Sequence, residues 1–195
     1  LTAACGGVLA VGDTVDREVT SFYVEHQIER EYEQGAMDAD VTDLWRTKYQ
    51  RVVRYNRTWT GAGDNPHFAS ESERCLRLGN AIQLCDSWSD SYHDGLVDVP
   101  LSMYENSTET DVLVVGGGDH DALADLRDHG GDVDRVDIDG EFMQAAKDGS
   151  FYTAKNERAW TYDHLDHTTG DGFAYAAATN ATYDVVVLDV PGATD

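Results

Sequence analysis

Residues 111–139 constrain the fold of this chain more than any other part of its sequence. Residues 112–115 are apolar at every position, as expected for a parallel strand that is buried on both faces. Three glycines follow at 116–118, and glycine lets the backbone turn sharply and approach a ligand closely. A helix and then a second strand at 133–138 complete the stretch. Together these segments predict a strand–helix–strand unit that binds a nucleotide-like ligand.

The acid near the end of the second strand indicates which part of the ligand this unit holds. Asp137 lies 21 positions after Gly116, close to the ~20 residues expected for a carboxylate that binds ribose hydroxyls. The loop is Gly-Gly-Gly-Asp-His and lacks the last glycine of a dinucleotide-binding loop, which admits the pyrophosphate. We therefore expect an adenosyl-sulfonium ligand, which carries no phosphate, and not a dinucleotide.

The remaining C-terminal sequence extends this unit into a larger sheet. It predicts a helix over 141–147, a third strand over 159–162, an alanine-rich helix over 173–178 and a fourth strand over 183–188. The predicted fold class is α/β, with a Rossmann-like, methyltransferase-type doubly wound parallel sheet. Because the chain stops six residues after Asp189, we expect this sheet to be truncated on its C-terminal side and the chain to be a fragment.

Four aspartates are expected at the edge of this sheet where a ligand binds. In open parallel sheets the ligand lies outside the carboxyl ends of the strands. The acids that follow a strand or open a helix at that edge are Asp119, Asp137, Asp171 and Asp189. The sequence therefore predicts a ligand site rich in carboxylates.

The N-terminal half is expected to form a smaller module. Residues 13–104 are typical of a linker and a β-hairpin module, with a turn at Gly79 and a helix that Pro100 ends; residues 105–195 form the incomplete nucleotide-binding domain. Residues 1–12 are apolar but too few to span a bilayer, which takes roughly 20 residues. They are interpreted as the end of a removed transmembrane helix or, alternatively, as a buried segment.

The net charge restricts the partners but not the substrate. The 195 residues include 37 acidic and 14 basic side chains, which give a formal charge of −23. Such a surface repels nucleic acid and anionic membrane, so we expect no nucleic-acid partner. Because the acids are spread along the whole chain, we interpret them as an adaptation to high salt and not as a docking face for a cation.

The cysteines and histidines do not predict a metal site. The three cysteines show no C-x-x-C spacing and are odd in number, which predicts reduced thiols and no structural zinc. The run 163–167 combines acids and histidines, and we interpret it as a solvated loop in an Asp-rich chain. We expect no metal, and a cytoplasmic protein or the soluble domain of a cell-membrane protein.

Several short motifs, taken in order, resemble those of the polyamine aminopropyltransferases, the spermidine synthase family. They are Tyr49-Gln50, LRLGNAIQ at 76–83, Tyr92-His93-Asp94, GGGDH at 116–120, Asp137-Ile138-Asp139, Asp171-Gly172 and Asp189. The resemblance covers about residues 47–190, with gaps similar to those of the family. The apolar start also resembles the membrane-anchored members of this family.

The resemblance implies a reaction and a role for each motif. The reaction is the transfer of an aminopropyl group from decarboxylated S-adenosylmethionine to a polyamine such as putrescine, with Asp189 as the general base. The residues that would hold decarboxylated S-adenosylmethionine are Gln50, Gly116, Gly117, Gly118, Asp137, Asp171 and Gly172. Those that would contact the polyamine are Tyr92, His93 and Asp119. Asp137 would bind the ribose hydroxyls and Asp171 the adenine amino group.

Several positions depart from the family pattern and keep other hypotheses open. Asp137 replaces the usual Glu, Gly79 and Asn80 replace the usual Asp-Gly, and His120 replaces the usual glycine. Where the family has a second acid three positions after the base, this chain has Gly192.

The alternatives are an S-adenosylmethionine-dependent methyltransferase and a membrane-anchored paralogue that binds a nucleoside or polyamine without turnover. A second copy of the chain, in a homo-oligomer, also stays open as a partner.

Overall fold

The computed structural model describes residues 2–31, 36–129, 131–148, 159 and 161–190. The chain divides into two compact units, of which the first comprises Leu1–Arg46 and Gln50–Ser87 and the second Thr47–Tyr49 and Trp88–Asp195. The boundary therefore falls before Trp88, whereas the sequence analysis placed it at residue 105. The reason is that the helical segment after Trp88 contributes Val97 and Leu101 to the core of the second unit.

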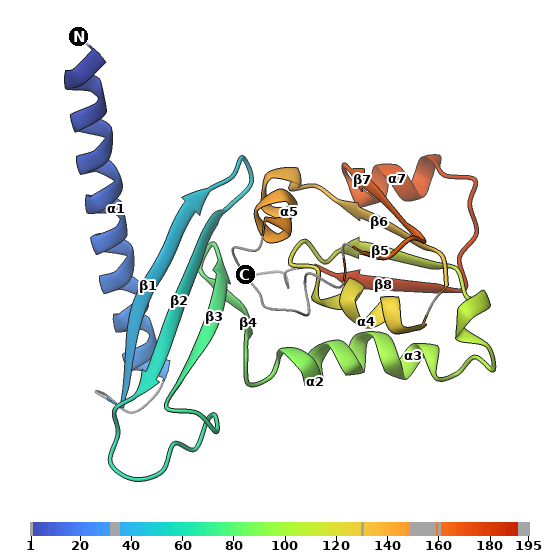
Figure 1. Cartoon of the computed structure of the whole chain (residues 1–195), viewed down its shortest axis with the longest axis horizontal. Helices are drawn as coiled ribbons and strands as arrows, with labels where there is room; N and C mark the ends of the chain where they lie inside the picture. The colour runs from blue at the N-terminus through green and yellow to red at the C-terminus, as the bar shows by residue number, and fades with distance from the viewer. Residues whose placement is uncertain (1, 32–35, 130, 149–158, 160, 191–195) are drawn as a thin grey trace. The chain divides into compact units, whose positions relative to one another are not determined.

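The first unit is an antiparallel sheet with one long helix (Figure 1). The strands are β1 (Met37–Arg46), β2 (Arg51–Trp59), β3 (Ser72–Leu78) and β4 (Ala81–Cys85), hydrogen-bonded in the order β1-β2-β3-β4. Helix α1 (Thr2–Glu31) packs against β1. Val24 and Ile28, which lie one helical turn apart, are fully buried, so α1 presents one apolar stripe to the unit's core.

The sequence predicted the hairpin of this unit but missed its N-terminal elements. The turn between β3 and β4 contains Gly79 at φ +61°, a left-handed conformation that glycine adopts without a steric cost. The sequence of β1 shows no clear alternation of apolar and polar residues, because its register with β2 shifts between Val41 and Asp43. No helix in the described part of the chain combines the length and apolar character that a membrane crossing requires.

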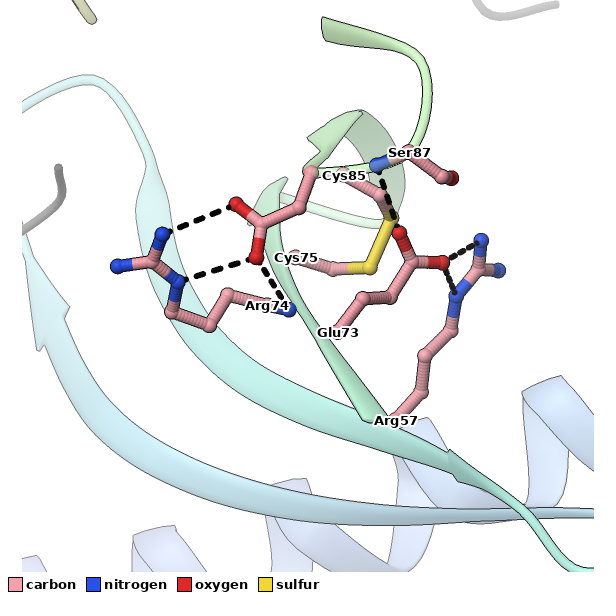
Figure 2. The surroundings of a disulfide bond; sticks show 7 residues. Arg57, Glu73, Arg74, Cys75, Cys85 and Ser87 are labelled. Carbon is pink, nitrogen blue, oxygen red and sulfur yellow. Dashed lines mark hydrogen bonds and ion pairs between the residues drawn. A yellow bond between two sulfur atoms is a disulfide. The ribbon is translucent and has the colours of Figure 1, made fainter. Parts of the chain in front are cut away.

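A disulfide joins β3 to β4, which contradicts the expectation of free thiols. Cys75 and Cys85 are direct partners in the strand register and both are buried. Figure 2 shows the charged groups beside the bond. The Arg57 Nε–H donates to Glu73 Oε1 at 2.7 Å, and the Ser87 N–H donates to Glu73 Oε2 at 2.8 Å.

The second unit contains the parallel sheet that the sequence predicted. Its strands are β5 (Val112–Gly116), β6 (Val133–Asp137), β7 (Leu165–Thr169) and β8 (Val185–Asp189), in the order β7-β6-β5-β8. All three pairings are parallel. In the register, Gly116 lies opposite Asp189 and Asp137 lies opposite Thr169. The carboxyl ends of all four strands therefore meet at one edge of the sheet.

Helices cover both faces of this sheet, as a doubly wound fold requires (Figure 1). They are α2 (Ser89–His93), the π-helical η1 (Asp94–Asp98), α3 (Val99–Leu101), the 3₁₀ turn η2 (Ser107–Glu109), α4 (Asp121–His129), α5 (Gly140–Lys147) and α7 (Gly172–Ala178). On one face, Val112 and Val114 pack with Leu123 and Leu126 of α4. On the other, the Tyr175 hydroxyl of α7 donates to Asp134 of β6 at 3.1 Å.

Three local predictions need correction. The third strand was expected at 159–162, of which residue 160 lies outside the described residues; the structure forms β7 instead, whose side chains are mostly exposed and carry no apolar pattern. Pro100 does not end its helix, because it lies in the first turn of α3, where its missing N–H costs no hydrogen bond. Helix α4 begins at Asp121, and Asp119 still accepts the Asp121 N–H at 3.2 Å.

Candidate active site at the carboxyl edge of the parallel sheet

The glycine loop after β5 lies directly against the end of β8. Gly116 has φ +91°, and a Cβ added at this position would collide with the carbonyl oxygen of Asp189. The Gly117 N–H donates to that same oxygen at 2.9 Å. Only glycine permits both this backbone conformation and this close approach. The loop therefore fixes Asp189 beside the position expected for the ligand.

Helix α2 brings two further side chains to Asp189. The Tyr92 hydroxyl lies 3.4 Å from Asp189 Oδ1, and His93 Nε2 lies 3.8 Å from Asp189 Oδ2. Asp119 joins them, since the polar atoms of His93, Asp119 and Asp189 all lie within 4.8 Å of one another. Asp189 Oδ2 is buried and accepts no hydrogen bond from the described residues. Four of the predicted site residues thus form one cluster with an unused acceptor.

The charges of this cluster favour a protonated His93. Burial by itself lowers the pKa of the imidazole, but the nearby carboxylates of Asp189, Asp119 and Asp121 outweigh it and raise the pKa to about 9. An imidazole with this pKa is positively charged at neutral pH. His93 is therefore unsuited to accept a proton from a substrate.

The pKa values of Asp119 and Tyr92 are raised by burial and by neighbouring carboxylates. Burial and the charges of Asp189 and Asp121 raise the pKa of Asp119 to about 7, while the charge of His93 lowers it. Burial and the neighbouring Asp189 also raise the pKa of Tyr92. Asp119 therefore gains its negative charge near neutral pH, where a bound ammonium would favour the ionised form.

The cluster of His93, Asp119 and Asp189 could hold a cation. One imidazole and two carboxylates at this spacing offer ligand atoms for it. A histidine that binds a metal must be neutral, so a metal ion here would have to displace the proton that the surrounding acids favour on His93. The cluster of Glu73, Cys75 and Cys85 in the first unit cannot bind a metal ion through cysteine thiolates, because its two sulfur atoms are bonded to each other.

Asp137 occupies the end of β6 beside the glycine loop. Its Oδ1 accepts the Asp139 N–H at 2.7 Å, and its Oδ2 would lie 3.0 Å from a Cβ added at Gly118. Burial raises the pKa of Asp137, although the Asp139 N–H and Arg135 oppose the shift. Asp139 caps α5 by accepting the Phe142 N–H at 3.1 Å. Asp137 thus faces the loop where the sequence analysis placed ribose hydroxyls.

The Asp171-Gly172 motif begins helix α7. Asp171 caps helix α7, since its Oδ1 accepts the N–H groups of Phe173 and Ala174 at 2.8 and 3.0 Å. A Cβ at Gly172 would collide with Val115 of β5, so this glycine allows the start of α7 to pack on the sheet. Gln50 immediately precedes β2 and belongs to the first unit. Gly192 lies outside the described residues.

Below the glycine loop lies a buried pair that the sequence analysis missed. Arg135 of β6 donates to the Gly117 carbonyl oxygen at 2.8 Å and to His120 Nδ1. The other ring nitrogen of His120, Nε2, lies 3.0 Å from the Met143 carbonyl oxygen, which fixes the neutral Nε2–H tautomer. Burial and the charge of Arg135 lower the pKa of His120 to about 3. The available signal was a single arginine among the valines and aspartates of β6.

A second missed group supports His93 from the side away from Asp189. Ser89 and Asp121 are 6% and 2% exposed, and the Ser89 hydroxyl donates to Asp121 Oδ2. Asp121 follows the expected helix start by two residues, so the sequence alone gave it no role.

Comparison with known proteins decides the family. The family model described as the spermine/spermidine synthase domain matches residues 89–192, more than half of the chain. The chain belongs to the spermine/spermidine synthase family. The matched segment contains every residue of the cluster around Asp189, so the family assignment and the local geometry concern the same part of the molecule.

Curated relatives and solved structures of this family agree with the assignment. Polyamine aminopropyltransferase 2 of Pseudomonas aeruginosa is 30% identical over 159 residues, which cover 78% of this chain and 43% of the relative. Polyamine aminopropyltransferase 2 of Aquifex aeolicus is 26% identical over 161 residues, which cover 81% of this chain and 29% of the relative. The chain therefore spans less than half the length of these relatives.

The solved structures confirm the fold. A spermidine synthase in complex with the transition state analogue AdoDATO superposes with a TM-score of 0.61 at 19% identity, covering 78% of this chain and 47% of that one. The spermidine synthase from Thermotoga maritima gives a TM-score of 0.60 at 20% identity, covering 76% and 47%. The α/β fold with a preceding β module, predicted from the sequence, is thus confirmed.

Proposed function

We propose that this chain transfers an aminopropyl group from decarboxylated S-adenosylmethionine to an amine such as putrescine, with Asp189 as the general base. The observation that carries the proposal is the cluster of Tyr92, His93, Asp119 and Asp189 beside the glycine loop. The curated relatives are named polyamine aminopropyltransferases, which supports the same chemistry here.

The proposed reaction is a displacement at carbon. The amine nitrogen attacks the methylene carbon that is bonded to the sulfonium sulfur. The new C–N bond forms as the C–S bond breaks. The electron pair of the C–S bond stays on sulfur, which leaves as the neutral thioether methylthioadenosine. The nitrogen must give up a proton, and the unused Oδ2 of Asp189 is the acceptor that the geometry favours.

The neighbouring groups would bind and orient the amine. Asp119 and Asp189 supply negative charge for an ammonium, and the Tyr92 hydroxyl holds Asp189 Oδ1. Because His93 is protonated, it would not compete for the proton of the substrate. Holding the nucleophile in line with the C–S bond lowers the barrier further. The nucleoside would lie over the glycine loop, with its ribose at Asp137; Asp171, Gly172 and Gln50 keep the roles that the family resemblance implies.

The first test measures nucleoside binding without turnover. On the full chain in molar salt, calorimetry should show binding of methylthioadenosine, and Asp137→Ala should weaken it by about 10- to 100-fold, because hydrogen bonds to a charged acceptor are lost. Asp132→Ala is the matched control, since Asp132 is exposed and precedes the same strand, β6. Equal affinity of wild type and Asp137→Ala would overturn the ribose assignment.

The second test distinguishes the three candidate functions. The chain is incubated with putrescine or a longer amine and with either decarboxylated S-adenosylmethionine or S-adenosylmethionine. Aminopropyl transfer supports the proposal, and methyl transfer would replace it with the methyltransferase hypothesis. Nucleoside binding without either product would favour the non-catalytic binding protein.

A further inference from the structure

His93 is held on two sides by groups of different kinds. On one side, its Nε2 faces Asp189 Oδ2 at 3.8 Å. On the other, its Nδ1 lies 2.8 Å from the backbone carbonyl oxygen of Ser89 and 3.8 Å from Asp121 Oδ2. Ser89 stands one turn earlier on α2, and Asp121 is the first residue of α4. Asp121 thus reaches the imidazole from a separate helix, at the ring nitrogen that does not face Asp189.

The hydrogen bonds fix one proton of the ring. A carbonyl oxygen only accepts hydrogen bonds, so Nδ1 must be the donor to Ser89. In a neutral imidazole, Nε2 would then carry a lone pair, and this lone pair would face the carboxylate of Asp189. Two electron-rich atoms repel each other in that arrangement, whereas a second proton on Nε2 makes the contact attractive.

Asp121 supplies charge that favours this second proton. The side chain is 2% exposed, and a buried carboxylate strongly stabilises a nearby positive charge. The Ser89 hydroxyl donates to Asp121 Oδ2, the oxygen nearest to His93, and so keeps the carboxylate directed at the ring. The titratable groups that act on His93 are Asp119, Asp121, Asp189 and the adjacent Tyr92 ring, and none of them is a base that carries positive charge.

We propose that Asp121 is a positioning residue that, together with Ser89, holds His93 as an imidazolium whose Nε2–H points at Asp189. Asp121 touches neither substrate in this assignment and acts only through His93. The direction in which the surrounding acids shift the pKa of His93, to about 9, agrees with it.

The charge of the His93 imidazolium also affects binding of the amine, an inference that rests on the proposed function. Asp119 and Asp189 lie close enough for their negative charges to repel each other. The positive charge of His93 offsets this repulsion and lowers the pKa of Asp119. Loss of the His93 charge would leave Asp119 protonated at neutral pH and would weaken attraction of an ammonium. Asp121 would therefore set amine affinity from a position outside the pocket.

The experiment follows His93 directly by NMR. The full chain is labelled with ¹⁵N-histidine, the His93 signals are assigned by their loss in His93→Gln, and both ring nitrogens are titrated with pH. In the wild type we expect both nitrogens to remain protonated well above the usual pKa of about 6.5. In Asp121→Asn the pKa of His93 should fall by about 1 to 3, as removal of an opposite charge at this distance predicts.

Matched variants separate this role from a general disturbance of the fold. Asp132→Asn removes the partner of another histidine, since Asp132 Oδ1 lies 2.8 Å from His164 Nδ1, and it should leave the His93 titration unchanged. Asp121→Glu keeps the charge and should keep the high pKa. It also provides the comparison if Asp121→Asn does not fold.

The outcomes decide the proposal whether or not the chain is an active transferase. A wild-type His93 that titrates at or below about 6.5, or an Asp121→Asn variant with an unchanged His93 pKa, would overturn it. Failure of the aminopropyl assay with an intact His93 titration would instead count against the proposed function alone. If turnover is present, Asp121→Asn should raise the KM for the amine more than that for decarboxylated S-adenosylmethionine.

Discussion

The two units bury charged side chains in opposite ways. In the first unit, Arg57 and Glu73 are 5% and 2% exposed and are in direct contact, and the remaining oxygen of Glu73 accepts the Ser87 N–H. In the second unit, His93 Nε2 and Asp189 Oδ2 stand 3.8 Å apart, and this buried oxygen accepts no hydrogen bond from the described residues. The closed pair joins two strands, whereas the open cluster keeps its attraction available to a ligand. Burial of charge alone therefore does not mark a site; incomplete pairing does.

The largest expected effect tests the open cluster. Asp189→Asn keeps the shape of the side chain but removes its charge and basicity, so aminopropyl transfer should fall about 10²- to 10⁴-fold. Methylthioadenosine carries no amine and should bind almost as well as to the wild type. The measurement is the turnover rate together with calorimetric affinity, and a variant that transfers at the wild-type rate would place the base elsewhere.

The next effect tests the closed pair. Glu73→Gln leaves the Arg57 guanidinium buried without its counter-charge, which should lower the free energy of unfolding by about 3–5 kcal/mol. The control is Asp86→Asn, which breaks the exposed pair that Arg74 Nε forms with Asp86 at 3.1 Å and should cost less than about 1 kcal/mol. Urea unfolding measures both, and equal costs would remove the distinction between the two kinds of pair.

The free energy of unfolding should depend on pH through two groups of the second unit, His93 and Asp119. His93 has a pKa of about 9 in the folded chain against an ordinary 6.5, so the folded state binds more protons between these values, and stability must fall as the pH rises through them. Asp119, raised from 3.8 to about 7, acts in the same direction at lower pH. The loss attributable to His93 is at most about 3 kcal/mol. Unfolding at about pH 6.5 and about pH 9 measures it, and His93→Gln should remove this slope.

The smallest effect concerns the disulfide of the first unit. Cys75 and Cys85 are 10 positions apart, and a loop of this size predicts about 2–3 kcal/mol of stabilisation. A reductant should lower the thermal midpoint of the wild type by that equivalent and should not affect the double variant Cys75→Ala, Cys85→Ala. Equal midpoints with and without reductant would show that the bond contributes nothing to the stability of the unit.

The sequence predicted the strands that are continuous apolar runs. Strands β5 and β8 are both runs of valine and leucine. Strand β5 is central, as such a run predicts, whereas β8 lies at an edge and exposes Val186 and Leu188. Strand β7 lies at an edge and is mostly exposed, so its sequence, LDHTT, carries no such pattern. Strand β1 is interrupted by a register shift. The sequence pattern therefore indicated the strands that are apolar runs, whether central or at an edge, and gave no signal for the polar or interrupted ones.

The sequence likewise predicted some residues of the site and not their supporting partners. Tyr92, His93, Asp119 and Asp189 belong to short motifs, and the structure brings them together as a strand–loop–helix unit predicts. Their supporting contacts join residues far apart in sequence: Ser89 and Asp121 are 32 positions apart, and His120 and Arg135 are 15 apart. No local pattern relates such partners, because only the packing of the helices on the sheet brings them together.

The His120–Arg135 contact has a consequence for how this loop can evolve. His120 has a left-handed φ of 76°, a conformation that a side chain adopts only at a cost, and its ring accepts a hydrogen bond from the fully buried Arg135. Replacement of His120 by glycine would relieve the backbone but would leave the guanidinium without that acceptor. Replacement of Arg135 alone would leave the histidine strained and would remove the hydrogen bond that Arg135 donates to Nδ1. The two positions are therefore epistatic: each is favourable only in the presence of the other, and relatives that carry glycine in the loop should carry an uncharged residue on the strand.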